Sequence, residues 1–157
     1  MTHQKLTKLL MWYPERPRFV EPIELLVKQG FQHFAPTDFE GFVLKLFEAF
    51  GFKGELTPIT GDGGVDIIVH DENGVVIVQC KKYDDDAKIG VKELREFIGA
   101  IVHSKALHGY FVTTSDYTEA ANEFASTHSN VTLINSRSLD RLFRLAILAA
   151  LGKLEGV

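Results

Sequence analysis

Cysteine is nearly absent from this 157-residue chain, and its scarcity excludes several kinds of protein. Because Cys80 is the only cysteine, the chain can form neither an internal disulfide nor a cysteine-rich zinc site. The chain also lacks an apolar run of about 18 residues, so we predict no transmembrane helix. Its first residues lack the basic, apolar and small-residue succession of a secretion signal. We therefore expect a cytoplasmic protein.

Positive charge is also limited in this sequence. Lys and Arg number 17 against 21 Asp and Glu, which gives a net charge of −4 and a pI of about 5.8. This balance argues mildly against a nucleic acid partner, yet an enzyme that gathers divalent cations with carboxylates can still present a local basic face. Hydrophobic residues make up 45% of the chain, enough for one globular domain with a sizeable core.

The first 36 residues differ in texture from the rest, because they hold four of the five prolines. Residues 21–30 resemble a short helix with proline in its first turn and glycine just past its end. We interpret residues 1–36 as an N-terminal extension that precedes a domain spanning residues 37–157. Trp12 and Arg16 could touch nucleic acid, although a packed arm or a subunit contact is the favoured interpretation.

A strong amphipathic helix begins at Thr37. Its apolar residues recur at helical spacing up to Phe50, and Gly51 is placed to end it. Thr37 and Glu40 match a capping box, in which the glutamate returns to the first amide of the helix. Glu40 also lies at the margin of the apolar stripe, from which it could point toward a site at the sheet edge. The spacing leaves both roles for Glu40 open.

A hairpin between residues 65 and 83 is the most informative local signal. Asn73-Gly74 lies between two runs rich in Val and Ile, as is typical of a two-residue type I′ turn. Such a turn places Asp66 opposite Lys81. Because side chains alternate along a strand, Asp66, Gln79 and Lys81 are expected on one face. The other face is expected to carry Ile67, Val78 and Cys80. The alternative to a converging site is an exposed cross-strand ion pair, worth under about 1 kcal/mol.

The remaining pattern predicts an α/β protein. The expected elements are a strand at 55–60, a helix at 90–104, a strand at 109–114, a helix at 117–126, a strand at 131–134 and a helix at 138–151. The three early strands are expected to form an antiparallel meander, and the later strands, reached through helices, to run parallel. Helices should then cover both faces of a mixed sheet.

Five ordered blocks carry a resemblance to a known family. They are Phe39-Glu40, the run Gly61 to Asp66, the run Gln79 to Tyr83, the run Val112 to Ser115, and Ala120-Ala121. Together they resemble the PD-(D/E)xK nuclease core, and more closely the catalytic domain of Mrr-type restriction endonucleases. The resemblance covers roughly residues 37–143 and implies a restriction-endonuclease-like fold.

The resemblance also implies roles for individual residues. Asp66 corresponds to the acid that binds a divalent metal, and Lys81 to the lysine that positions or activates the attacking water. Gln79 stands where many relatives have an acid, and glutamine is typical of the Mrr branch. Glu40 would be an extra carboxylate, and the Cys80 main-chain carbonyl a further ligand. Carboxylate and carbonyl oxygens suit Mg²⁺, with Mn²⁺ as a substitute.

The implied function is a divalent-metal-dependent DNA endonuclease, in restriction or phage defence. One alternative is a Holliday-junction resolvase or repair nuclease with the same core, and another is a catalytically weak DNA- or protein-binding module. We expect a homodimer, since duplex cleavage needs two active sites. Because only residues 1–36 stand in the place of a recognition domain, either a separate recognition subunit provides specificity or specificity comes from DNA structure. The residues assigned to DNA contact are Lys82, Tyr83, Lys92, Arg95 and Ser115; for Lys92 and Arg95 a solvated helix face is the alternative.

Overall fold

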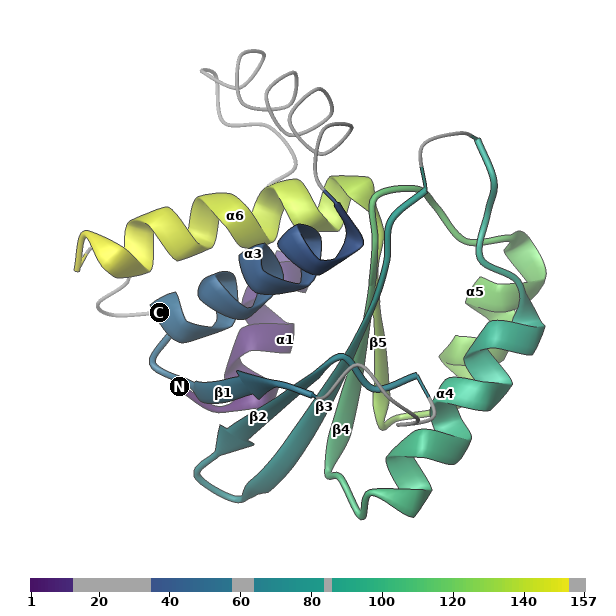
Figure 1. Ribbon diagram of the computed structural model, residues 1–157, viewed down its shortest axis with the longest axis horizontal. Helices are drawn as coiled ribbons and strands as arrows, with labels where there is room; N and C mark the ends of the chain where they lie inside the picture. The colour runs from purple at the N-terminus through teal and green to yellow at the C-terminus, as the bar shows by residue number, and fades with distance from the viewer. Residues whose placement is uncertain (13–34, 58–63, 84–85, 153–157) are drawn as a thin grey trace.

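A five-stranded mixed sheet lies between two helical layers in the computed structural model, which describes residues 1–12, 35–57, 64–83 and 86–152 (Figure 1). The strands, in their order across the sheet, are β1 (Lys53–Leu56), β2 (Ile67–Asp71), β3 (Gly74–Lys81), β4 (His108–Thr113) and β5 (Val131–Ile134). The first three pair antiparallel, and β3, β4 and β5 pair parallel. The predicted fold class, with its meander and parallel strands, is confirmed.

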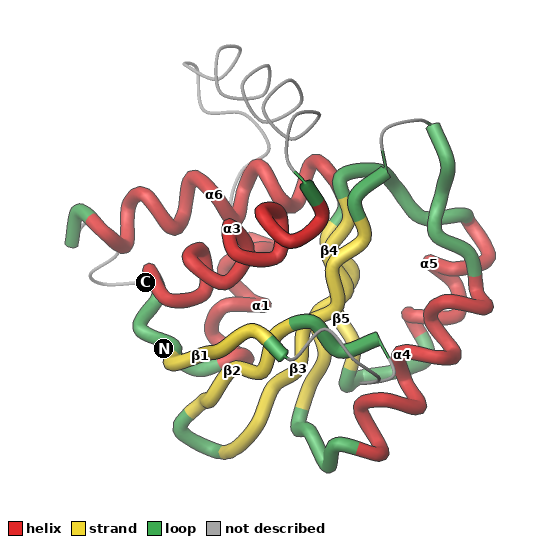
Figure 2. The backbone as a smooth tube through the Cα atoms, viewed as in Figure 1, coloured by secondary structure: helices red, strands yellow, loops and turns green. Residues whose placement is uncertain are grey.

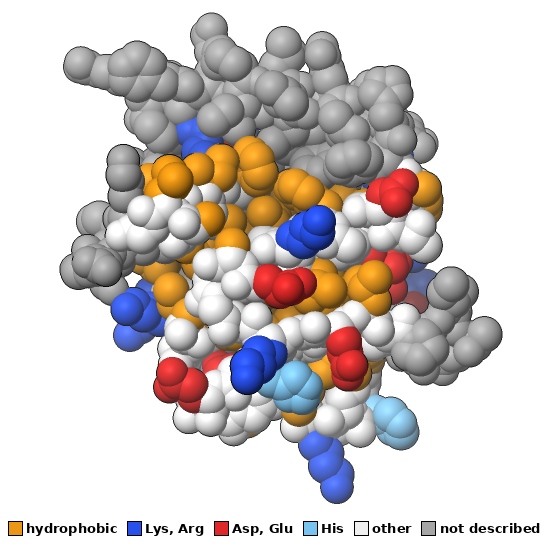
Figure 3. Space-filling view, turned by 60° about the vertical axis from the view of Figure 1, so that its left-hand side comes forward, with side chains coloured by type: hydrophobic (Ala, Val, Ile, Leu, Met, Phe, Trp, Pro, Cys, Tyr) orange, Lys and Arg blue, Asp and Glu red, His pale blue; other side chains and the backbone are white. Residues whose placement is uncertain are grey.

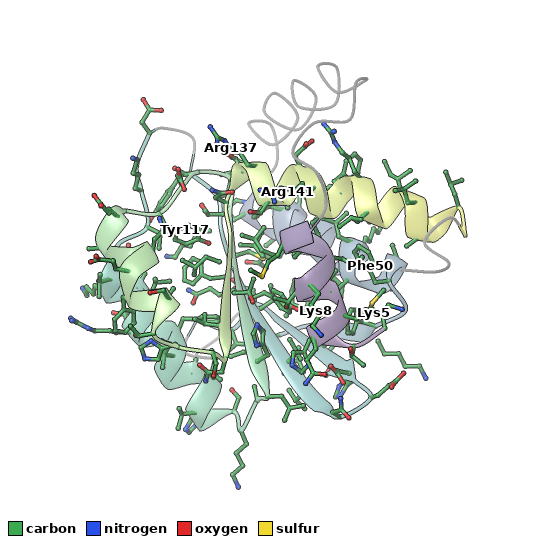
Figure 4. All side chains as sticks on the ribbon, turned by 180° about the vertical axis from the view of Figure 1, so that it is seen from behind. Lys5, Lys8, Phe50, Tyr117, Arg137 and Arg141 are labelled. Atoms are coloured by element: carbon green, nitrogen blue, oxygen red, sulfur yellow. The ribbon has the colours of Figure 1, made fainter. Side chains whose placement is uncertain are left out.

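The helices are divided between the two faces of the sheet. One face is covered by α1 (His3–Trp12), α3 (Pro36–Ala49) and α6 (Ser136–Ala150), and the other by α4 (Val91–His103) and α5 (Glu119–Ser126) (Figure 1). Each layer has its own apolar core, because alternate strand residues point to opposite faces. Figure 4 shows Phe50 in the first layer and Tyr117 in the second.

Most element bounds agree with the sequence prediction within two residues. The α4 helix is flanked by Gly90 and Ser104, and β5 has the predicted limits. The α6 helix starts two residues earlier than predicted, because the Asn135 side chain accepts the Ser138 N–H and caps it. The first strand starts earlier too, at Lys53, and residues 58–60 of its predicted range lie outside the described residues.

The α1 helix was missed by the sequence prediction. Its signal was present, since Leu6, Leu9 and Leu10 recur at helical spacing, and all three are buried in the core shared with α3 and α6. The helix predicted at residues 21–30 lies outside the described residues. The division between an extension and a domain at residues 36 and 37 also stays a prediction.

The predicted type I′ turn at Asn73-Gly74 is wrong. Glu72 and Asn73 form the turn, and Asp71 pairs with Gly74. The Asp71 carboxylate accepts the Asn73 N–H at 2.7 Å, and this local contact favours a turn one residue earlier. A type I′ turn needs positive φ at both central residues, and among the described non-glycine residues only Lys105 has it.

The predicted capping box of Thr37 and Glu40 is also wrong. Proline occupies the first position of α3, so the helix starts at Pro36 with Ala35 as its N-cap. Asp38 then stands at the third position, and its carboxylate accepts the Ala35 N–H at 3.3 Å. Glu40 is therefore available for another role.

The outer surface carries no membrane-spanning element among the described helices, since none is long and apolar enough to cross a bilayer. The side that carries α3, α6 and β1 shows a band of hydrophobic side chains bordered by charged ones (Figure 3). Leu56 of β1 and Ile147 of α6 are exposed large apolar residues.

Candidate active site

The candidate site lies at the sheet edge where β3, β4 and β5 end. Because β2 runs antiparallel to β3, the residue that enters β2, Asp66, reaches the same edge as Lys81, which ends β3. The loops that follow these strands meet there (Figure 2). The carboxyl ends of parallel strands commonly carry ligand sites, because side chains and loop amides converge at that edge.

Asp66 lies next to the paired residues of β2 and β3, at a different register position from the predicted one. Its N–H donates to the Val78 carbonyl at 2.9 Å, although Ile67 is the residue paired with Val78. Two residues therefore lie against one, which is the arrangement of a β-bulge, and bulges redirect side chains. The Asp66 carboxylate accepts the Cys80 N–H at 2.7 Å, so Asp66 does not lie opposite Lys81. Ile67 and Val78 face the α3 layer together, as predicted.

Thr57 holds the segment that carries Asp66. Its N–H donates to the Asp66 carbonyl at 2.9 Å, and its hydroxyl donates to the Val65 carbonyl at 2.5 Å. These two bonds join the end of β1 to the approach to β2. Sequence reasoning did not identify Thr57, because no local pattern distinguishes it from an ordinary residue at a strand end.

Glu40 and Asp66 form a carboxyl pair across the gap between α3 and the sheet. The two carboxyl groups are close enough for a protonated Glu40 to donate a hydrogen bond to the Asp66 carboxylate. Burial, the charge of Asp66 and that hydrogen bond raise the pKa of Glu40. Burial also raises the pKa of Asp66, against the opposing effects of the Cys80 amide, the Glu40 hydrogen bond and the charge of Lys81. Two neighbouring acids repel each other when both are ionised, and a bound cation removes that repulsion.

The oxygen atoms around this pair fit a hard divalent cation. An extended residue points its N–H and C=O to the same side of the strand, and the Cys80 N–H points to Asp66. The Cys80 carbonyl therefore points to that side as well. Within the described ranges, no cluster of three or more His, Cys, Asp and Glu side chains forms a metal site, so further protein ligands would be amide or main-chain oxygens.

Gln79 and Lys81 extend the site along β3. The Gln79 side chain is half-buried and lies against Gly64, which has a φ of +86°. Lys81 is half-buried and close enough for its charge to lower the pKa of Asp66. The structure thus brings Asp66, Glu40 and Lys81 together, with Cys80 beneath them. Burial and the two nearby acids raise the pKa of the Cys80 thiol, so its side chain is a poor nucleophile.

The ends of β3 and β4 are tied together by Thr114, which lies in the block from Val112 to Ser115 but to which the sequence assigned no contact of its own. The Thr114 hydroxyl accepts the Tyr83 N–H at 3.0 Å and donates to the Tyr83 carbonyl at 3.2 Å. This pair of bonds fixes the main chain just beyond Lys81. The buried Tyr117 hydroxyl donates to the Phe111 carbonyl at 2.6 Å and so holds the segment before α5 against β4.

The residues assigned to DNA contact are divided between two places. Tyr83 and Ser115 lie at the site edge, where the Ser115 hydroxyl donates to the Ala87 carbonyl at 2.5 Å and so supports the loop after β3. Lys92 is exposed in the first turn of α4. Arg95 lies over the Phe124 ring, with 5.6 Å from its guanidinium carbon to the ring centre, in a shallow groove between α4 and α5. Lys82 is half-buried and makes contacts of its own.

Comparison with known proteins assigns this arrangement to a family. A family model described as "Restriction endonuclease", of the Mrr catalytic type, matches residues 31–143, which is most of the chain. The chain belongs to this restriction endonuclease family. Among curated relatives, the type IV methyl-directed restriction enzyme EcoKMrr of Escherichia coli (strain K12) is 34% identical over 116 residues. The match covers 69% of this restriction endonuclease domain but 38% of EcoKMrr, so the chain spans well under half of that relative.

Solved structures agree on the fold of this restriction endonuclease domain. MspJI restriction endonuclease, determined in complex with a 27-mer oligonucleotide, has a TM-score of 0.65 at 20% identity, covering 88% of this chain and 34% of that one. The DNA modification-dependent restriction endonuclease AspBHI has a TM-score of 0.65 at 21% identity, covering 88% and 39%. These values establish the restriction-endonuclease-like fold.

Proposed function

We propose that this protein is a divalent-metal-dependent endonuclease that hydrolyses phosphodiester bonds in DNA. The observation that carries the proposal is the contact between the Glu40 and Asp66 carboxyl groups beside Lys81, at the edge where β3 ends. Membership of the restriction endonuclease family supports the same activity. We further propose a cytoplasmic protein that acts in DNA restriction.

Each residue of the site has a defined role in this proposal. Asp66 and Glu40 would hold the ion through carboxylate oxygens, with the Gln79 amide oxygen and the Cys80 carbonyl as neutral ligands. Mg²⁺, or Mn²⁺ in its place, would supply Lewis-acid stabilisation of phosphorane charge and a hydroxide-like nucleophile near neutral pH. Lys81 orients the water or neutralises the scissile phosphate, because an ammonium is a compact charge with three donors. The Cys80 amide holds the Asp66 carboxylate in place.

Three candidates for the function are distinguished: two nucleases that differ in substrate, and a binding module. EcoKMrr is described as methyl-directed, so methylated DNA is one candidate, read by a separate recognition subunit. The second candidate is a branched junction or a repair substrate, where DNA structure alone provides specificity. The third is a binding module of low activity, because Gln79 leaves the site one negative charge short of the common acidic set.

Cleavage assays on defined DNA would test the proposal. Purified protein would be incubated with supercoiled, linear, methylated and four-way-junction DNA, with Mg²⁺, Mn²⁺ or chelator. Asp66→Ala and Lys81→Ala should each lower the cleavage rate at least about 100-fold, since each removes charge stabilisation from the reacting phosphate. Glu55→Ala and Lys53→Ala, on the exposed part of β1, are the matched controls and should cleave like the wild type.

The pattern of results selects among the candidates. Cleavage confined to the junction selects a resolvase, and cleavage confined to methylated DNA selects a modification-dependent enzyme. If the wild type and both site variants bind DNA but none of them cleaves any substrate, the nuclease assignment is overturned in favour of a binding module.

A further inference from the structure

The side-chain amide of Gln79 occupies the space into which a side chain at position 64 would project. A Cβ atom at position 64 would lie 3.0 Å from Gln79 Nε2, 3.1 Å from Oε1 and 3.2 Å from Cδ. The Cβ would therefore meet the end of the amide group, and the amide would have to move by a few tenths of an ångström to admit it.

The main chain at Gly64 gives a second reason for glycine. Its φ of +86° is in the left-handed region, which residues with a Cβ rarely adopt. Gly51, which follows α3, has nearly the same φ of +90°, but a Cβ added there would meet no atom within 4 Å. The two glycines therefore separate the effect of backbone strain from the effect of the Gln79 contact.

The absence of a side chain at position 64 decides where the Gln79 amide can lie. The last torsion of a glutamine side chain is broad, so an unsupported amide samples many orientations. A side chain at position 64 would push the amide out of the space that it occupies and so change its orientation. A neutral amide is a weak ligand compared with a carboxylate, so its orientation decides how much it contributes to ion binding.

We infer that Gly64 is a positioning residue, which seats the Gln79 amide so that its oxygen faces the ion held by Asp66 and Glu40. The inference rests on the proposed function only in its metal site, since it requires a divalent cation but no cleavage. It also accounts for a glutamine in a place where many nucleases of this fold have an acid, because an amide held in one orientation contributes more to ion binding than a mobile amide does.

Side-chain ¹⁵N spectroscopy of the intact protein would test the inference. The Gln79 amide signal, assigned by its loss in Gln79→Ala, would be followed during titration with Mg²⁺ alone. In the wild type, relaxation should show this amide to be more ordered than that of the exposed Gln4. Gly64→Ala should release or displace the Gln79 amide and weaken Mg²⁺ binding about 10-fold or more, as loss of a supporting contact does in other metal sites.

Controls make the outcome decisive. Gly51→Ala should lower the thermal midpoint as Gly64→Ala does but keep the Gln79 signal and the Mg²⁺ affinity of the wild type. In the Gln79→Ala background, Gly64→Ala should cause no further loss of Mg²⁺ affinity. The inference is overturned if the two glycine variants behave alike, if the wild type binds no Mg²⁺, or if Gln79 is as mobile as Gln4. The last observation needs no glycine variant. A wild type that binds Mg²⁺ through Gln79 but cuts no DNA contradicts only the proposed nuclease.

Discussion

The two carboxyl groups of Glu40 and Asp66 are the residues on which the site depends most. Their contact joins a helix to the sheet, and burial together with the neighbouring acid raises the pKa of Glu40. Such a pair is unfavourable while both acids are charged, and a divalent cation removes the repulsion. Glu40 is free to serve here because Asp38 caps α3.

Replacement of Glu40 by glutamine should separate two effects of this pair: the repulsion between the acids in the ion-free protein, and the binding of Mg²⁺. Glu40→Gln keeps the shape and a hydrogen-bond donor toward Asp66 but removes one charge, so the ion-free protein should melt at the same or a higher temperature. Stabilisation by Mg²⁺ should fall, because one carboxylate ligand is lost. Thermal melts with and without Mg²⁺ would measure both effects. Glu48→Gln, an exposed change on the same helix, should alter neither.

At the scale of elements, α1 is held to the sheet by a buried polar cluster as well as by leucines. The Asp71 carboxylate accepts the His3 main-chain N–H at 2.8 Å and contacts the His3 ring at 2.5 Å. The His3 ring stacks on His108, with 5.1 Å between ring centres, and His108 Nε2 lies 2.6 Å from the Thr132 hydroxyl. These contacts join α1 to β2, β4 and β5.

This cluster should make folding sensitive to acid. Burial and the nearby His3 lower the pKa of His108 from 6.5 to about 4. A depressed pKa contributes stability that is present above pH 6.5 and is lost as the pH falls toward 4, because the unfolded chain then takes up the proton more readily. The loss should be on the order of 3 kcal/mol. Urea unfolding at pH 7.5 and 4.5 would measure it.

The matched variant for this acid effect is His108→Gln, which retains a polar group toward Thr132 but does not titrate. It should show a smaller loss of stability on acidification than the wild type. Asp71 has a lowered pKa as well, because the His3 and Asn73 hydrogen bonds and the nearby His3 outweigh the effect of burial. The stability that Asp71 contributes is lost only below the ordinary pKa of an aspartate, so the wild type and the variant both retain it between pH 7.5 and 4.5. Equal losses in the two proteins would show that His108 is not the cause.

At the scale of the whole molecule, an acidic protein has to meet a polyanion through a local basic surface. The net charge is −4, so productive encounter depends on where the cations stand. Lys81 ends β3 at the site, and Lys92 is exposed in the first turn of α4. Lys5 and Lys8 instead point outward from α1 (Figure 4).

Salt dependence would locate the DNA on this surface. If Lys92 contacts a phosphate, Lys92→Gln should reduce the slope of log affinity against log salt concentration by about 1 and weaken binding to all sequences alike. Lys53→Gln makes the same charge change at the opposite end of the sheet and should leave the slope unaltered. Fluorescence anisotropy with labelled DNA at several salt concentrations would measure both. Identical slopes for the two variants would place the phosphates elsewhere.

We also predict that the active protein is a homodimer, since cleavage of both strands needs two sites and the described fold presents one. Sedimentation at micromolar concentration, alone and with DNA, would measure its mass. A strictly monomeric protein that still makes double-strand breaks would contradict this prediction.

The elements that could be predicted are those whose signals are local. The α4 helix follows from its apolar periodicity and β5 from its short apolar run. In the structure, a glutamate that returns to Gly90 and a threonine cap at Thr118 also begin α4 and α5. The α1 helix had the same kind of signal and was missed because the prolines after it suggested an extension. The acid, amide and lysine of the hairpin were likewise visible in the sequence, together with their order on β2 and β3.

The sequence by itself determined the fold class, the family and the residue types of the site, because these depend on neighbours along the chain. Only the tertiary structure decided the place of each group. The role of Glu40 depends on its meeting Asp66 across the gap between α3 and the sheet. The position of the Gln79 amide next to Gly64 likewise depends on two segments brought together by packing. Such contacts join residues that are distant in the chain, so no local pattern records them.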